Sequence, residues 1–245
     1  MKNNTFLILL FALWCSVVTS YAQDEVKPFK HMSVSVNAGT LGVGIQLASP
    51  VTSWLSLRTG VMMFQYTYDY DYKDVIYYEV EEGVSLDYEA VIPMKAKANM
   101  VNGLLLADFF PLRNKRFHVT GGMYIGTSDI IKVRADYAVR PVEIGDVIIA
   151  PSINGRVAAH LKTNGFKPYV GFGYGRSVTQ TKRFGFKVEL GAMFHGSPKV
   201  RVVEGQDITS IKELEINEKI SDFNKFLKDF NIYPVLNLQL NFRAF

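Results

Sequence analysis

Apolar and polar residues alternate along much of this chain with a period of two. Such alternation means that one face of a β-strand meets an apolar medium and the other face does not. The pattern is clearest near the C-terminus, where Leu236, Leu238 and Leu240 alternate with polar residues. It predicts strands at about residues 32–38, 41–48, 55–63, 101–109, 117–125, 170–174, 184–194 and 236–242.

The residues between the apolar positions are unusual for the core of a soluble protein. Many are glycine, such as Gly171, Gly185 and Gly191, and they leave little bulk to fill a core. A soluble sandwich or a lipocalin-like barrel would also alternate, but charged residues on its inner face would be out of place. Large apolar residues outside and small or charged residues inside are typical of a transmembrane β-barrel. The charged residues on the inner face are Arg58, Asp108, Lys187, Glu189 and Arg243.

The segments between the predicted strands are alternately short and long. The short ones are residues 49–53, 111–115 and 178–182, and the long ones are about 69–95, 127–165 and 197–232. Outer-membrane barrels have short periplasmic turns and long external loops in this order. We therefore expect an all-β fold, a transmembrane antiparallel up-and-down β-barrel of about eight strands with both ends in the periplasm. Pairing of residues 131–139 with 156–161 would raise the count to ten or twelve.

One segment, Ser210–Phe230, has helical rather than β periodicity. Ser210 and Glu213 form a capping box at its start. Strand parity puts this amphipathic helix in the last external loop, where it could cover the barrel mouth, bind a partner or lie on the membrane surface. Its apolar face consists of Ile216, Ile220, Phe223, Leu227 and Phe230.

The N-terminus has the features of a secretory signal peptide. Lys2 precedes an apolar run at residues 6–18, and Ser20-Tyr21-Ala22 supplies small residues for cleavage. The run is too short for a comfortable membrane-spanning helix. We predict a signal peptide at residues 1–22 and a barrel domain at residues 23–245. The single cysteine, Cys15, lies in the signal, so the mature chain can form neither a disulfide nor a thiolate metal site.

Composition narrows the function further. The 27 Lys and Arg residues exceed the 23 Asp and Glu residues by only four, without a basic arm, which argues against nucleic-acid binding. Aromatic residues fall near the expected strand ends, where they form girdles in membrane barrels, although they are common in strands generally. The candidates for these girdles are Trp54, Phe109, Phe110, Phe117, Tyr124, Tyr169, Tyr174, Phe184 and Tyr233.

Four segments resemble small Gram-negative outer-membrane barrels of the OmpA/OmpW-like, porin-family kind. They are residues 102–111 (NGLLLADFFP), 117–126 (FHVTGGMYIG), 167–175 (KPYVGFGYG) and 233–245 (YPVLNLQLNFRAF). The resemblance implies location in the outer membrane, contact with outer-membrane lipids and insertion by the barrel-assembly machinery. Phe245 resembles the aromatic last residue that this machinery reads. Because Phe245 is out of phase with its strand, Phe242 is the alternative assembly signal.

Two further motifs suggest chemistry. In residues 66–73 (YTYDYDYK), alternating Tyr and Asp could stack sugar rings or bind a divalent cation, or form a solvated strand above the membrane. His195 and Ser197 are similar to the His-x-Ser pair of some outer-membrane lipid A deacylases, which would need Glu204 or Glu213 as the orienting acid. The adjacent Pro198 and the inward phase of His195 argue against this. No metal-ligand cluster or phosphate-binding loop is visible in the sequence.

These observations together predict a protein that is not an enzyme and needs no cofactor. The five inward charges should form a salt-bridged network, and an eight-stranded barrel is too narrow for an open aqueous channel. We expect an outer-membrane barrel with a closed or narrow lumen, which displays external loops for envelope integrity or for binding an unidentified external ligand. The alternatives are passive, porin-like transport of a small or apolar solute and, more distantly, a lipid A-modifying hydrolase.

Overall fold

The computed structural model describes residues 31–80, 84–111, 116–138, 140–144, 147–177, 183–208 and 231–244. The predicted signal peptide, the predicted helix Ser210–Phe230 and the terminal Phe245 lie outside these residues. No helix in the described part of the chain is long and apolar enough to cross a membrane.

Eight strands form a closed antiparallel barrel. Each strand pairs with the next one along the barrel, and β1 pairs with both β2 and β14, so the sheet has no free edge at this level. The predicted all-β barrel of eight strands is confirmed. The barrel strands are β1 (Ser33–Gly39), β2 (Gly42–Pro50), β3 (Leu55–Val80), β4 (Val84–Phe109), β5 (Phe117–Gly126), β10 (Phe166–Gly175), β11 (Phe184–Phe194) and β14 (Ile232–Arg243).

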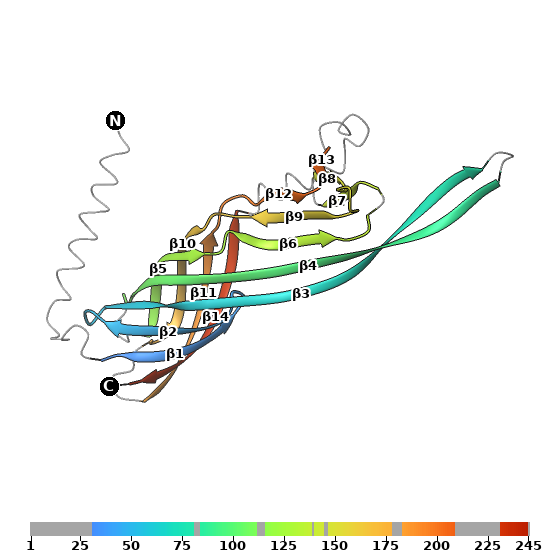
Figure 1. The fold of residues 1–245 in the computed structure, drawn as a ribbon. Helices are drawn as coiled ribbons and strands as arrows, with labels where there is room; N and C mark the ends of the chain where they lie inside the picture. The colour runs from blue at the N-terminus through green and yellow to red at the C-terminus, as the bar shows by residue number, and fades with distance from the viewer. Residues whose placement is uncertain are drawn as a thin grey trace, which may run out of the picture.

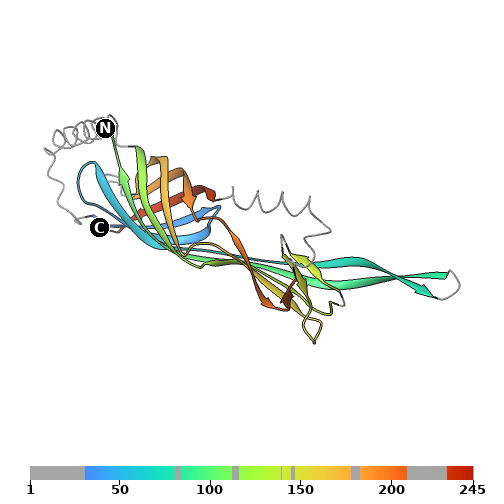
Figure 2. The same ribbon diagram turned by 90° about the horizontal axis from the view of Figure 1, so that it is seen from above.

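Beyond one end of the barrel, part of its wall continues as an open sheet, which we call the extension sheet. The outer parts of β3 and β4 pair with each other, and β6 (Asp129–Ala135), β9 (Val157–Lys162) and β12 (Lys199–Glu204) follow in that order. Figure 1 shows the long β3–β4 hairpin running far past β1 and β2, and Figure 2 shows the same projection from above. The segments near 131–139 and 156–161 thus do pair, but outside the barrel, so they do not raise its strand count.

A small second sheet packs against the extension sheet. It consists of β7 (Val142–Ile144), β8 (Val147–Ala150) and β13 (Gln206–Asp207). Apolar residues from both sheets form a core of their own, separate from the barrel interior. Its buried members are Ile92, Ala135, Ala138, Val142, Ile149, Val157 and Ala159.

The barrel wall has the polarity that the alternation predicts. Ile45 and Leu240 point outward and are 64% and 65% exposed, whereas Ser35 and Gln46 face inward and are 1% exposed. Leu41 is an exception. The alternation predicts that its side chain points outward. Leu41 instead lies in the turn between β1 and β2, and its side chain packs inside the barrel, at 1% exposure.

Glycines on the inner face make room for large side chains rather than leaving the interior thinly filled. A Cβ atom added at Gly171 or Gly191 would lie 2.5 Å or 2.3 Å from the hydroxyl of Tyr169. Tyr169 and Tyr124 are 3% and 1% exposed and meet edge to face, so the girdle prediction is wrong for both. They belong to an apolar cluster inside the barrel, with Leu41, Met62, Leu104, Leu106, Met193 and Val235.

The packing of Tyr169 against these glycines can be tested by substitution. Gly191→Ala should lower the free energy of unfolding by about 1–3 kcal/mol, because the added methyl group overpacks the interior against Tyr169. Gly121→Ala is the matched control, since nothing lies within 4 Å of an added Cβ there. It should leave stability unchanged or raise it slightly. Denaturant titration of the folded protein in detergent measures both, and equal effects would show that Tyr169 is not held as described.

Candidate functional site

Four of the five predicted inward charges meet inside the barrel. Arg58 comes from β3, Asp108 from β4, and Lys187 and Glu189 from β11. The Arg58 Nη2 atom lies 2.8 Å from Asp108 Oδ1 and 2.6 Å from Glu189 Oε2. The Lys187 Nζ atom lies 2.6 Å from Asp108 Oδ2 and 3.0 Å from Glu189 Oε2. Two positive and two negative side chains therefore balance, and none is more than 1% exposed. We call these four residues the charge network.

The charge network joins opposite walls of the barrel. In the closed order of eight strands, β3 and β11 are four strands apart, the largest separation possible. The β3 residue Arg58 nevertheless bonds directly to Glu189 on β11. A charge-assisted hydrogen bond of this kind fixes geometry more strictly than apolar contact does. The interior is therefore bridged by side chains at this level.

Neutral hydrogen-bond donors complete the coordination of both carboxylates. The Tyr169 hydroxyl donates to Glu189 Oε1 at 2.8 Å, and the Thr120 hydroxyl donates to Asp108 Oδ1 at 2.8 Å. Ser177 Oγ donates to Asp108 Oδ2 at 3.1 Å. A buried ion pair offsets the loss of hydration only when its remaining lone pairs are filled in this way.

Arg243, the fifth predicted member, lies apart from the other four. It has the inward phase of β14 but sits at the end of that strand, where it is half-buried. Its backbone N–H donates to the carbonyl of Arg183 at 2.9 Å. Within the described residues it bonds to neither Asp108 nor Glu189, because those side chains lie deeper in the barrel.

His118 joins the charge network although the sequence analysis did not select it. Its Nε2 atom lies 3.4 Å from Glu189 Oε2, and Gly173 provides the space for its ring. With Asp108 and Glu189 it forms a group whose ligand atoms lie within 4.8 Å of one another, as in a metal site. The chemistry does not favour a cation here, because Arg58 and Lys187 already neutralise both carboxylates. The only sequence signal for His118 is its inward phase on β5.

Lys167 was also missed and lies near the outer end of the barrel interior. Its Nζ atom donates to Asn102 Oδ1 and to the backbone carbonyl of Thr127, both at 2.8 Å. Thr127 follows β5 at the point where the wall continues into the extension sheet. Lys167 therefore stabilises the junction between the two parts of the fold.

The hydrolase hypothesis loses one of its two candidate acids. His195 follows β11, and its carbonyl accepts a hydrogen bond from Asn164 N–H at 2.9 Å. Glu204 instead pairs with Ala158 in the sheet and accepts a bond from Ser152 at 3.5 Å. Ala158 and Asn164 are six residues apart along one edge, or about 20 Å in an extended strand. Glu204 therefore cannot orient His195, and Glu213 lies outside the described residues.

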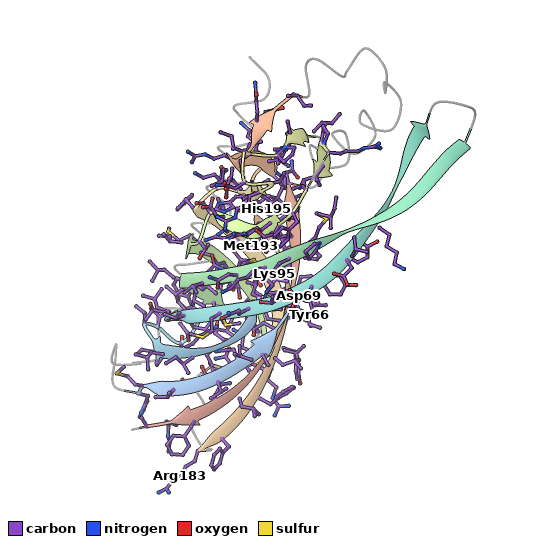
Figure 3. The ribbon with its side chains drawn as sticks, turned by 45° about the vertical axis from the view of Figure 1, so that its right-hand side comes forward. Tyr66, Asp69, Lys95, Arg183, Met193 and His195 are labelled. Atoms are coloured by element: carbon purple, nitrogen blue, oxygen red, sulfur yellow. The ribbon has the colours of Figure 1, made fainter. Side chains whose placement is uncertain are left out.

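The described Tyr and Asp side chains of residues 66–73 do not form one site. Because side chains alternate along β3, Tyr66, Tyr68 and Tyr70 share one face and Asp69 and Asp71 share the other. Tyr68 and Tyr70 stack with ring centroids 6.4 Å apart. Asp69 Oδ1 lies 3.3 Å from Lys95 Nζ on the neighbouring strand. Figure 3 labels both residues.

Comparison with known proteins gives a structural likeness alone. No protein-family model matches the chain, and no curated protein matches it. Among solved structures it is similar to CarO2 of Acinetobacter baumannii, with 17% identity and a TM-score of 0.52 over 89% of this chain and 100% of that one. It is also similar to CarO of the same organism, with 20% identity and a TM-score of 0.46 over 90% and 99% of the two chains. At this identity the likeness to CarO2 shows a shared barrel fold, and the OmpA/OmpW-like assignment stays a prediction.

Removing one member of the charge network should destabilise the barrel strongly. Asp108→Asn should lower the free energy of unfolding by about 3–5 kcal/mol, because it leaves Lys187 and Arg58 in excess in a buried site. Asp69→Asn removes a carboxylate from an exposed ion pair and should have little effect. Denaturant titration in detergent compares the two. Equal losses would mean that Asp108 is not part of a balanced buried network.

Proposed function

We propose that the chain is a non-enzymatic outer-membrane β-barrel with a closed interior, which displays the extension sheet outside the membrane. The observation that carries this proposal is the inverted polarity of the barrel. Its outward face is apolar and exposed, whereas its inward face carries the charge network. A hydrocarbon environment stabilises such an outer face, and barrel closure satisfies the backbone hydrogen bonds that lipid cannot. The bacterial outer membrane is the setting in which such barrels occur.

Two layers of side chains support a closed interior. The charge network crosses the barrel from β3 to β11. The apolar cluster around Tyr124, Tyr169 and Met193 fills the interior beside it, and Tyr169 bonds to Glu189 and so links the two layers. A narrow barrel filled in this way offers no continuous path for ions. Display and binding therefore fit the structure better than general diffusion does.

One observation favours the alternative of passive transport. Buried polar atoms of Asn37, Gln46 and Asn237 have no hydrogen-bond partner within the described part of the chain. These residues lie on the adjacent strands β1, β2 and β14 and face the interior. Unpartnered buried polar groups commonly bind water. A hydrated strip along this wall would be the route of a small polar solute if the barrel conducts.

The membrane location predicts a strong position dependence for an introduced charge. Leu190→Arg puts a charge on the outward face of β11 and should cost about 2–4 kcal/mol in a lipid bilayer. Val203→Arg, at an equally exposed apolar residue on β12 in the extension sheet, should cost almost nothing. Unfolding of both variants in lipid vesicles measures these costs. Heat-dependent gel migration and membrane fractionation of the wild type test the membrane location itself. Recovery of the wild type as a soluble periplasmic monomer would refute the proposal.

The closed interior predicts negligible conductance. The wild-type protein should give no steady ion current in a planar lipid bilayer. Combining Tyr124→Ala with Tyr169→Ala removes two rings from the apolar cluster and serves as a comparison in which that layer is opened. A steady wild-type current would replace the display function with passive transport.

A further inference from the structure

The outward face of the extension sheet is rich in positive charge. The strand register places like charges directly opposite one another: Lys97 faces Lys132, and Lys162 faces Lys199. On the next two strands, Lys132 faces His160, which faces Arg201. Positive side chains therefore run across four neighbouring strands, β4, β6, β9 and β12. We call Lys97, Lys132, Lys162, Lys199 and Arg201 the basic face.

The register places an acidic residue of β6 or β9 opposite the basic face only at Lys162, which faces Asp129 as well as Lys199. Asp69 pairs with Lys95 at 3.3 Å, Asp136 with Arg134 at 3.0 Å, and Asp129 with His160 at 3.5 Å. None of the five residues of the basic face forms an ion pair within the described residues. Like charges directly opposite each other destabilise a sheet. Their accumulation is therefore unfavourable unless an anion from outside the chain offsets it.

The position of the basic face relative to the apolar belt of the barrel identifies the source of that anion. On β4, Val101 and Leu105 point outward and are 42% and 52% exposed, and Lys97 has the same phase. Lys97 lies four residues beyond Val101, or about 13 Å along the strand. Lys162 likewise precedes the outward-facing Phe166 by four residues. The basic face thus begins where the apolar belt ends, on the same side of the wall.

We propose that the basic face binds the phosphate groups of lipid headgroups in the membrane leaflet next to the extension sheet. The inference rests on the proposed membrane location of the barrel but not on its closed interior. Lipid tails would contact the apolar belt, and headgroup phosphates of the same molecules would reach the Lys and Arg side chains directly above it. Each such side chain near an anionic surface strengthens binding about fivefold. The ligand class is a phosphorylated membrane lipid, held by charge at its head and by apolar contact at its tails.

The test uses the full mature chain in phosphatidylcholine nanodiscs, with and without diphosphorylated lipid A. Native mass spectrometry after transfer to mild detergent counts the lipid A molecules that stay bound. The wild type should retain lipid A, and this retention should weaken as salt rises. Lys97→Gln combined with Lys132→Gln should weaken lipid A binding about 25-fold, about fivefold for each lysine removed. The control variant combines Arg116→Gln with Arg183→Gln and so removes two exposed charges at the opposite end of the barrel. Figure 3 shows Arg183 at that end. The control variant should retain lipid A as the wild type does.

Stability gives a second readout that a purely structural role of the lysines would not reproduce. Without lipid A, the Lys97→Gln and Lys132→Gln double variant should be as stable as the wild type or more stable, because cross-strand repulsion is removed. With lipid A, the wild type should gain stability that the double variant lacks. Equal retention by the double variant and the wild type would overturn the proposal, as would full displacement by inorganic phosphate, which would indicate a general anion site. Failure of the wild type to enter nanodiscs would instead refute the membrane location.

Discussion

The barrel depends on the ion pairs that Arg58 makes with Asp108 and Glu189. Arg58 connects neighbouring strands through Asp108 and opposite walls through Glu189. A buried guanidinium group is costly unless its donors are used, and here they reach both carboxylates, Gln46 and Thr120. The side chains around it must therefore have the right identity and the right register at once. Only an alignment of the strands that brings these groups to one level meets this requirement.

The same inverted polarity organises the rest of the molecule. Because the polar groups are gathered and neutralised inside, the outer surface is left to large apolar side chains. Two hollows lie between bulky side chains on that surface. One, of about 600 Å³, is lined by Phe184, Phe186 and Leu240. The other, of about 650 Å³, is lined by Phe172, Leu190 and Leu236. Above the belt, the outward face becomes positively charged, on β4 within one continuous strand and on β6, β9 and β12 after short irregular segments. One wall thus presents surfaces of two chemistries, in the order in which a lipid molecule presents its tails and its head.

Alternation was enough to predict the barrel strands, the direction of most of their side chains and four members of the charge network. The position of a residue in the alternation shows whether its side chain points into or out of the barrel. The interior is narrow, so four inward-pointing charged side chains contact one another: Arg58, Asp108, Lys187 and Glu189. Phase does not show which distant residues share a level, because that depends on the stagger between strands. Arg243 faces inward but lies at a strand end, and Gly191, which makes room for Tyr169, belongs to the neighbouring strand β11. These relations are set by pairing across the barrel and are not visible along one strand.

Two errors had a different origin, since the information was present in the sequence. Tyr124 and Tyr169 have the inward phase of their own strands, yet their position near strand ends suggested a girdle. Phase is the stronger guide here, because the pleat determines side-chain direction whatever the residue type.

The extension sheet could not be predicted in this way. Its strands continue those of the barrel after short irregular segments such as 127–128 and 163–165, and only long-range pairing shows that they remain in one wall.

The unbroken hairpin of β3 and β4 has a mechanical consequence. Each strand is 26 residues long and pairs with the other from Leu55–Phe109 to Val80–Val84 without a register shift. About 17 residues of β3 lie beyond Met63, where the apolar belt ends, which corresponds to roughly 55 Å of extended strand. Since the hairpin and the barrel share one ladder of hydrogen bonds, the tilt of the barrel strands sets the direction in which the hairpin leaves the wall. A load applied to its outer part would therefore be transmitted through the paired backbones into the barrel wall, as it would not be through a flexible loop.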